Sequence, residues 1–425
     1  MSVEVTPGMF SSRKTVTKVT YRPTIVMFVV ALFVTVVFGF AGPTTPVAFR
    51  LTPADAALAI PDIVATSSLI GIMTGILGLA LATLSLLRVR RGLRSGMWIN
   101  LTFGFLAVTA LLSFVGTGNT VPVTFLLTGT LALSAPLILG AMSGVLSERV
   151  GVVNIAIEAQ LLSGAFVAAV VGTITQNLVL GVLAAMVAGA LVAVILAWFS
   201  IRYFVDQIIV GVVLNVLVIG ITDFLHAQWL SEDEIGTNFP GTLSFISVPF
   251  VSEIPVFGPL LFSNRATVYL VFLTVPLLWF ILFRTRYGLR LRSVGEYPLA
   301  ADTMGINVAL NRFVWVTVGG MIAGIGGAAL SIGNVGGFVR EMSSGQGFIA
   351  LAAVILGRWH PFTVSAAALL FGFASIFRIW AGQVNAAIPS DFIQMIPYLV
   401  TLIAVAGFVG RVRPPASSGK PYIKE

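Results

Sequence analysis

The sequence predicts an all-α, polytopic membrane protein with about 10 to 12 transmembrane helices and both termini in the cytoplasm. Hydrophobic residues make up 57% of the 425-residue chain and charged residues only 9%, and the mean hydropathy is +1.02. A soluble globular domain carries roughly 25% charged residues. Apolar runs that are long enough to cross a bilayer recur along the chain, and short polar connections separate them.

Each predicted span is an apolar run of about 20 residues. The first run follows a polar segment that is longer than the start of a cleavable signal, so it is predicted to be a retained span. The run at 346–358 is too short for a full crossing, and we expect a broken or re-entrant helix there. The predicted helices lie near 23–42, 63–87, 97–116, 122–146, 152–172, 178–200, 206–226, 267–284, 312–332, 346–358, 361–380 and 391–410.

The distribution of Arg and Lys sets the orientation. If the N-terminus is cytoplasmic and every run crosses, 20 basic residues lie inside and three, Arg50, Arg265 and Arg340, lie outside, with Arg378 near the outer end of a span. This is the positive-inside pattern, and it places both termini and the loop 285–311 in the cytoplasm. The net charge of +8 is therefore explained by topology, and no nucleic-acid partner is expected.

Two further features concern the architecture. The longest outer loop, about 227–266, is either a docking surface for an external partner or a solvated connector, and the sequence favours neither. Gly71 with Gly75 and Gly320 with Gly324 are small-xxx-small pairs, which permit close helix packing and indicate architecture rather than a functional site.

The polar, basic loop at 285–311 contains a short helix with its own start and stop signals. Pro298 suits a first helical position, and Gly305 suits the left-handed residue just past the end of a helix at 298–304. A short helix held between two membrane spans is shaped to dock in a groove of a partner. The loop therefore suggests a membrane subunit driven by a separate motor protein, and the alternative is an ordinary basic inside loop.

The chain shows no pattern of a catalytic, metal or cofactor site. Its only Gly-Lys pair, Gly419-Lys420, precedes Pro421, so the phosphate-cradling motif of ATPases is missing. There is no Cys, and His226 and His360 belong to no metal-ligand pattern. We expect no catalytic residues, no metal and no cofactor, and we expect ATP hydrolysis on a separate chain.

Three stretches together match a known family pattern. They are Ser147-Glu-Arg-Val-Gly-Val-Val-Asn-Ile-Ala-Ile-Glu-Ala-Gln160, the loop at 288–308, and Met342-Ser-Ser-Gly-Gln-Gly-Phe-Ile-Ala-Leu-Ala-Ala-Val-Ile-Leu-Gly-Arg-Trp359. This chain resembles the permease subunits of ATP-binding cassette (ABC) importers, in the branch that takes up nucleosides, simple sugars and branched-chain amino acids. The first and third stretches are most similar to bacterial nucleoside permeases, and Asp206-Gln-Ile-Ile-Val-Gly-Val-Val-Leu-Asn215 fits the same group.

The resemblance covers roughly 122–410 and departs from the family in two places. Ala159 stands where family members usually have Gly, and Leu299 stands in the glutamate position of the pattern Glu-Ala-Ala-x-x-x-Gly. We divide the chain into a cytoplasmic tail, N-terminal spans outside the resemblance, a permease core that contains the coupling loop 285–311, and a second cytoplasmic tail. These segments are 1–22, 23–121, 122–410 and 411–425.

The resemblance implies a multi-pass protein of a bacterial plasma membrane, embedded in the lipid bilayer and assembled with three kinds of partner. These are a cytoplasmic ABC ATPase, a second related permease that forms a heterodimer with this chain, and an extracytoplasmic substrate-binding lipoprotein. In such a machine the 298–304 helix sits in a cleft of the ATPase, and closure of the ATPase pair moves the adjoining spans.

The resemblance also implies which residues couple to the ATPase. Charged residues would orient the contact, and Ala300 and Ala301 would let the backbones approach. The candidate coupling residues are Gly288, Arg290, Arg292, Glu296, Pro298, Ala300, Ala301, Asp302 and Gly305. Ser147, Glu148 and Arg149 form either a second ATPase contact or a charged turn.

A nucleoside needs a few amides or carboxylates and an aromatic face in a mostly apolar cavity. Ionisable groups within a membrane rarely face lipid, and on a helix Asn154 and Glu158 would share one face. The candidates for the substrate pathway are Asn154, Glu158, Gln160, Asn215, Asp223, Gln346 and Phe348. The alternative is that these groups bond between helices or satisfy broken backbone.

The sequence therefore predicts an ABC importer permease for nucleosides. Ribose-like sugars or branched-chain amino acids are alternative cargoes for the same machine. A secondary transporter driven by an ion gradient would need more intramembrane acids than Glu158 and Asp223, and it would leave the coupling loop unexplained. A structural or receptor subunit, in which the loop docks a partner without gating, is the third alternative.

Overall fold

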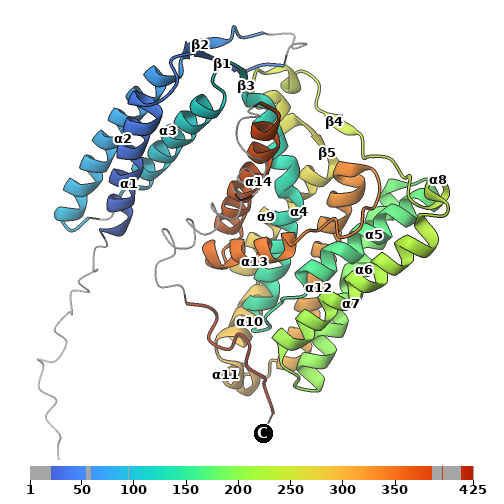
Figure 1. Cartoon of the computed structure of the whole chain (residues 1–425). Coiled ribbons are helices and arrows are strands. Elements are labelled where there is room, and N and C mark those ends of the chain that lie inside the picture. The colour runs from blue at the N-terminus through green and yellow to red at the C-terminus, as the bar shows by residue number, and fades with distance from the viewer. Residues whose placement is uncertain (1–20, 54–58, 94, 385–394, 396–412, 425) are drawn as a thin grey trace, which may run out of the picture. The chain divides into compact units, whose positions relative to one another are not determined.

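The computed structural model describes residues 21–53, 59–93, 95–384, 395 and 413–424, and it is mainly helical (Figure 1). Among the described residues, ten helices are long and apolar enough to cross a membrane, which confirms the predicted polytopic all-α class. They are Arg22–Phe40, Ser67–Arg90, Met97–Val115, Val123–Arg149, Ile157–Thr175, Leu178–Arg202, Gln207–Leu230, Ala266–Arg284, Val308–Val335 and Pro361–Val384. Apart from Met395, the predicted span at 391–410 lies outside the described residues.

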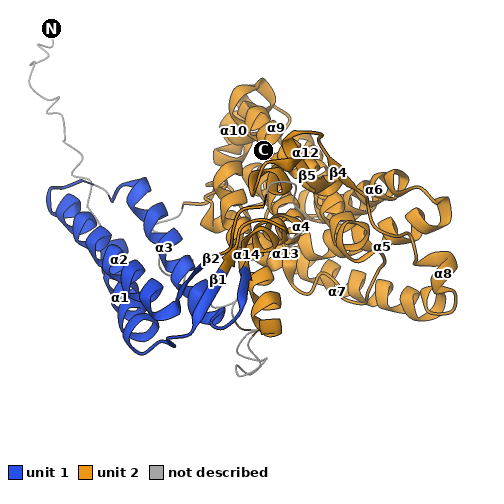
Figure 2. Ribbon diagram, turned by 90° about the horizontal axis from the view of Figure 1, so that it is seen from above, with its two compact units in different colours: residues 1–48, 64–121 blue, residues 49–63, 122–425 orange. Residues whose placement is uncertain are grey.

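The chain divides into two compact units (Figure 2), residues 1–48 with 64–121 and residues 49–63 with 122–425. The first unit holds three long helices, α1 (Arg22–Phe33, with a π-helical extension Val34–Phe40), α2 (Ser67–Arg90) and α3 (Met97–Val115). Three short strands pair in the order β2-β1-β3, and they are β1 (Pro46–Arg50), β2 (Ile63–Thr66) and β3 (Thr120–Pro122).

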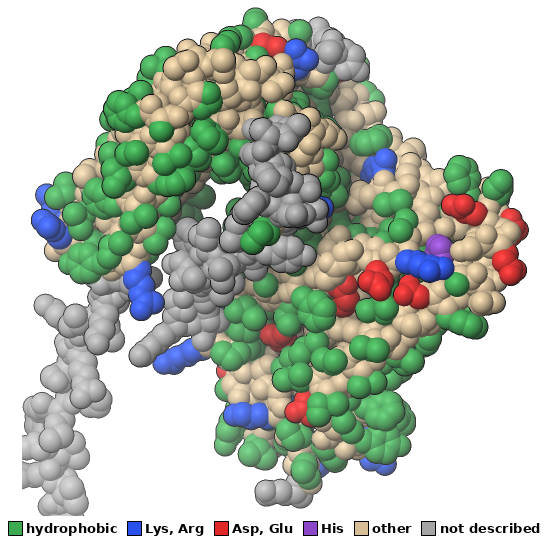
Figure 3. Space-filling model, in the orientation of Figure 1, with side chains coloured by type: hydrophobic (Ala, Val, Ile, Leu, Met, Phe, Trp, Pro, Cys, Tyr) green, Lys and Arg blue, Asp and Glu red, His purple; other side chains and the backbone are tan. Residues whose placement is uncertain are grey.

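The second unit contains the remaining elements. Its helices are α4 (Val123–Arg149), α5 (Ile157–Thr175), α6 (Leu178–Ala197), α7 (Gln207–Leu225), α8 (Glu234–Thr237), α9 (Ala266–Arg284), α10 (Arg286–Glu296), α11 (Pro298–Thr303), α12 (Val308–Leu330), α13 (Gln346–Leu356) and α14 (Pro361–Val384). Strands β4 (Phe245–Ser247) and β5 (Ser263–Arg265) form an antiparallel pair. Near α8, Figure 3 shows acidic side chains gathered at the surface, where Glu232, Asp233 and Glu234 are exposed.

Small residues bring the helices of each unit close together. A Cβ atom on Gly71 would lie 2.6 Å from the carbonyl carbon of Phe38, and one on Gly189 would lie 2.7 Å from the backbone nitrogen of Gly324. Helices in a bilayer gain little from the hydrophobic effect, so they associate through such tight van der Waals contacts. Both predicted glycine pairs are thus confirmed as packing positions, and α12 packs against α4, α5 and α6 at the centre of the second unit.

Helix α13 is short, as predicted. It has 11 residues, which gives a length of roughly 16 Å, about half the thickness of the hydrocarbon core. Gly345, with φ +80°, immediately precedes it and sets the sharp entry into its first turn. A polar loop therefore meets the start of α13, and the backbone N–H groups of that start require partners within the protein.

Candidate functional site

Helix α10 packs closely against the end of α9 at Gly288. The Thr285 hydroxyl caps the helix by accepting the Gly288 N–H at 3.2 Å. Gly288, Leu291 and Val294 are buried, whereas Tyr287, Leu289 and Arg290 are exposed. A Cβ atom on Gly288 would lie 2.5 Å from the Cα atom of Leu282. This close approach fixes α10 on the spanning helix α9, and the other face of α10 is left free.

The predicted miniature helix is present as α11. Pro298 occupies its first turn and Gly305 follows it with φ +80°, although the helix ends at Thr303, one residue earlier than predicted. Ala301 is only 3% exposed and packs into the chain, whereas Ala300 is exposed, so only Ala300 of the predicted pair offers a free surface.

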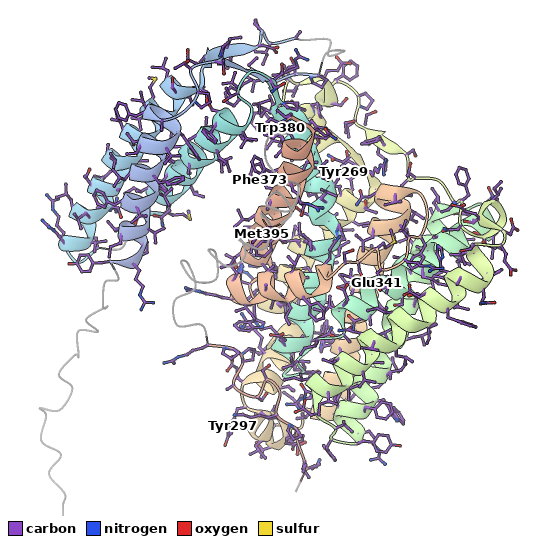
Figure 4. The ribbon with its side chains drawn as sticks, in the orientation of Figure 1. Tyr269, Tyr297, Glu341, Phe373, Trp380 and Met395 are labelled. Carbon is purple, nitrogen blue, oxygen red and sulfur yellow. The ribbon has the colours of Figure 1, made fainter. Side chains whose placement is uncertain are left out.

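Three apolar side chains flank α11 on the outside. Leu299 is 48% exposed and Met304 is 81% exposed, and Tyr297, labelled in Figure 4, is also exposed. They stand in the polar loop 285–311 rather than on a spanning helix, so their exposure is not explained by contact with lipid tails. Monomeric surfaces seldom leave such groups uncovered without a partner.

The charged coupling candidates differ in their surroundings. Arg290 is exposed. Arg292 lies with its guanidinium 5.1 Å from the centre of the Phe283 ring. The Glu296 carboxylate accepts the Ala416 N–H at 3.4 Å, and Asp302 pairs with Lys424 at 3.4 Å. The last two acids therefore face the C-terminal segment of the same chain.

The possible second ATPase contact, at the end of α4, bonds mainly to other parts of the same chain. Ser147 and Glu148 are buried, and the Trp359 indole donates a hydrogen bond to Glu148 at 2.5 Å. Arg149 donates to the Trp359 carbonyl at 3.1 Å and lies 5.9 Å from the centre of the Phe283 ring. Arg149 and Arg292 thus approach one aromatic ring. The structure therefore brings the end of α4 and the coupling loop 285–311 together.

The turn after α13 holds a titratable group outside the spanning helices. Burial of the His360 ring, together with the nearby positive charge of Arg149, lowers the pKa of this imidazole. Its Nδ1 atom is buried and has no hydrogen-bond partner among the described residues. Protonation of His360 is therefore disfavoured in the folded chain.

A buried amide cluster joins α4 to the entry of α5. The Asn154 amide donates to Ser143 at 3.1 Å and to Gln160 at 3.2 Å, and Ser143 donates to Gln160 at 3.0 Å. Asn154, Gln160 and Ser143 are fully buried. Because α5 begins at Ile157, Asn154 precedes the helix, and the expectation that it shares one helix face with Glu158 is wrong.

Glu158 closes the polar start of α13. Its carboxylate accepts the Ser343 hydroxyl at 2.7 Å, the Gly345 N–H at 2.7 Å and the Gly347 N–H at 2.6 Å. Backbone N–H groups at a helix start attract negative charge, so this buried acid has the partners that it needs. Asn215 likewise accepts the Ala159 N–H and donates to the Ile155 carbonyl, both at 3.0 Å.

The remaining pathway candidates have fewer hydrogen-bond partners within the chain. The Oε1 atom of Gln346 and the Oδ1 atom of Asp223 are buried and have no hydrogen-bond partner among the described residues. Gln346 begins α13 and Phe348, two residues later, is 49% exposed, whereas Asp223 lies near the end of α7. Among the described residues, no group of three His, Asp or Glu side chains could hold a metal ion.

The sequence does not single out several residues that make hydrogen bonds to distant segments, even where they lie in a stretch that matches the family pattern. They are serines, a tryptophan and an arginine in ordinary contexts, and only their distant partners give them a role. These residues are Ser143, Arg312, Ser343, Trp359 and Ser417.

Comparison with known proteins places the chain in a family. The family described as branched-chain amino acid transport system / permease component matches residues 126–405. The guanosine ABC transporter permease protein NupQ of Bacillus subtilis is 40% identical over 69% of this chain and 95% of NupQ. The nucleoside ABC transporter permease protein NupC of Lactococcus lactis is 37% identical over 69% of this chain and 95% of NupC.

A glucose ABC transporter permease protein of Haloferax volcanii, TsgB13, is 28% identical over 66% of this chain and 76% of TsgB13. No solved structure was found to match the chain. The family match spans residues 126–405, and NupQ and NupC are each more than 30% identical to this chain over nearly their whole length. The chain therefore belongs to the family of branched-chain amino acid transport system permease components.

Proposed function

We propose that this chain is the membrane-spanning permease of an ABC importer that carries nucleosides into the cell across a bacterial plasma membrane. The observation that carries the proposal is the similarity to NupQ and NupC along nearly their whole length. The spanning helices supply the pathway, and ATP hydrolysis takes place on a separate cytoplasmic ABC ATPase.

In this proposal α11 is the helix that docks in the ATPase. Its support is the exposed apolar group formed by Tyr297, Leu299 and Met304, which stands ready for a partner's groove. Because α10 approaches α9 closely at Gly288, a push on α11 moves the adjoining span rather than bending a free loop. Arg290 remains available to orient the contact.

Two further partners complete the proposed assembly. A second related permease forms a heterodimer with this chain, and an extracytoplasmic lipoprotein delivers the nucleoside. The exposed acidic residues Glu232, Asp233 and Glu234 in the loop 227–266 offer that lipoprotein a charged docking surface.

Within the pathway we assign the nucleoside contacts to the start of α13. Asn154, Glu158, Gln160 and Asn215 already bond to protein groups, whereas the Gln346 amide oxygen has no partner among the described residues. A partly exposed aromatic ring, Phe348, lies two residues further. An amide and an aromatic ring at the same helix start are the two kinds of group that suit a flat, hydrogen-bonding base.

The test is uptake of labelled uridine and adenosine by cells with and without the gene, with unlabelled ribose, glucose or leucine as competitors. Uptake that needs the gene and ATP and is insensitive to the competitors is the expected result. Competition by a sugar or by leucine changes the cargo and keeps the importer. Uptake that survives loss of ATP but collapses with the ion gradient overturns the proposal.

The same assay tests the pathway residues. Gln346→Leu should reduce uptake severalfold by removing a hydrogen-bonding amide, while the amount of assembled protein stays constant. Gln228→Leu, at an exposed position near the end of the helix Gln207–Leu230, is the matched control. Equal uptake by the two variants would remove Gln346 from the pathway.

A further inference from the structure

We infer that residues 413–424 form a brace that fixes the coupling helices α10 and α11 to α12 and to the α4–α5 turn, with Ser417 and Arg312 as its positioning residues. We call this segment the C-terminal brace. The inference rests on the proposed coupling role of α10 and α11, and it assigns a function to a segment that the sequence presents only as a basic tail.

The brace completes the C-terminal end of α10. Ser417 is 5% exposed, its N–H donates to the Gly295 carbonyl at 2.9 Å, and its hydroxyl lies 2.6 Å from the same oxygen and 3.1 Å from the Val294 carbonyl. The last carbonyl groups of a helix have no partner within it. A segment more than 100 residues away in the sequence therefore supplies the donors that end α10.

The brace also holds the start of α12 through a buried arginine. Arg312 is 2% exposed and donates from Nη1 to the Lys420 carbonyl at 3.0 Å, while its Nη2 lies 3.5 Å from the Ser417 hydroxyl. Neither ion pair among the described residues includes Arg312. A buried guanidinium without a carboxylate depends on such acceptors, so the brace and Arg312 stabilise each other.

The third anchor is the turn between α4 and α5. The Gly419 N–H donates to the Gly151 carbonyl at 3.3 Å. Gly151 has φ +92°, and a Cβ atom there would lie 2.7 Å from the Ser417 hydroxyl and 3.0 Å from Arg312 Nη2. Three segments that are distant in the sequence thus converge on Ser417.

This arrangement determines how a movement is transmitted. Without the brace, α11 joins the spans only through the chain at either end of α10 and α11 and through their direct packing. With it, a displacement of α10 is carried by hydrogen bonds to α12 and to the end of α4. The brace therefore raises the fraction of ATP-driven movement that reaches the pathway, and it needs no contact with nucleoside or ATP.

The experiment uses the complete complex in liposomes and measures nucleoside uptake and ATP hydrolysis together. Ser417→Ala and Arg312→Gln should lower the nucleoside transported per ATP about fivefold, which corresponds to the loss of roughly one hydrogen bond, while ATP hydrolysis persists. Ser418→Ala removes the same atom from the neighbouring residue, whose side chain forms no hydrogen bond to the described part of the chain, and should keep the ratio of the unaltered complex. If Arg312→Gln does not assemble, Ser417→Ala decides alone.

An unchanged ratio in Ser417→Ala overturns the inference. Amide hydrogen exchange gives a second readout that needs no cargo, since loss of the brace should speed exchange in residues 286–303 and Ser418→Ala should not. If the unaltered complex shows no ATP-driven nucleoside uptake, the proposed function fails, and the exchange rates alone decide whether the brace holds the coupling helices.

Discussion

Glu158 shows how one side chain can hold two segments that meet inside the protein. It lies in the first turn of α5, and its three donors come from residues 343–347. A Cβ atom on Gly347 would lie 2.6 Å from the Cα atom of Glu158, so the two backbones touch at this point. The carboxylate therefore holds the start of α13 in place, and this role does not depend on contact with a transported molecule.

Glu158→Ala should lower the free energy of unfolding by about 2 to 3 kcal/mol, because three donors lose their acceptor in a place that water reaches poorly. The measurement is the thermal unfolding midpoint of the purified protein in detergent. Glu341→Ala is the control, since Glu341 lies in the same loop with an exposed side chain (Figure 4). Equal midpoints for the two variants would contradict the role of Glu158.

His360 should make the stability of the chain depend on pH. Its pKa is lowered in the folded state by burial and by Arg149, so below the ordinary imidazole pKa of about 6.5 the unfolded chain binds the proton more readily. The contribution is complete above that pH and is lost as the pH falls. The unfolding midpoint should drop between about pH 7 and pH 5.5, and less so in His360→Asn. A parallel fall in both proteins would assign the effect to other groups.

At the scale of elements, glycines decide where the coupling helices can lie. Gly288→Ala places a Cβ atom 2.5 Å from the Cα atom of Leu282, so α10 must shift away from α9. We expect a loss of about 1 to 3 kcal/mol in stability, as for other overpacked contacts, and reduced ATP-dependent uptake. Gly220→Ala on α7 is the control, because nothing lies within 4 Å of its new Cβ atom and alanine favours the helix. A milder effect at Gly288 than at Gly220 would exclude a tight α9–α10 contact.

Local signals in the sequence are sufficient to predict some elements and do not predict the bounds of others. Proline and glycine punctuation predicts α11, and the length of an apolar run predicts the short α13. The start of α5 at Ile157 is not predicted, because the preceding residues 151–156 are as apolar as the residues of the helix itself. They form a turn through the hydrogen bonds of Asn154 and Asn215.

The same limit applies to the candidate site. The rarity of intramembrane acids is enough to single out Glu158 in the amino-acid sequence, whereas its donors in 343–347 and the place of Ser417 depend on contacts between distant segments. A hydroxyl has no preferred partner in the sequence, so the fold alone determines which helix end it completes.

At the scale of the whole molecule, the arrangement of charge predicts which side of the membrane each loop faces. Arg and Lys beside the spans resist translocation, and the inferred division of 20 inside to three outside sets one orientation for the chain. The structure adds that the C-terminal brace lies against α10, so the C-terminal segment and the loop 285–311 share one side.

The absence of cysteine makes this orientation directly measurable. Single substitutions at exposed positions, Glu232→Cys, Arg286→Cys and Ile423→Cys, give one thiol each without background. A membrane-impermeant maleimide should label Glu232→Cys in right-side-out vesicles and label the other two only after permeabilisation. Labelling of Arg286→Cys in intact vesicles would place the coupling loop outside, where no ATPase can reach it. Opposite labelling of Arg286→Cys and Ile423→Cys would contradict the contact between α10 and the brace, because a segment cannot pack on a helix from across the bilayer.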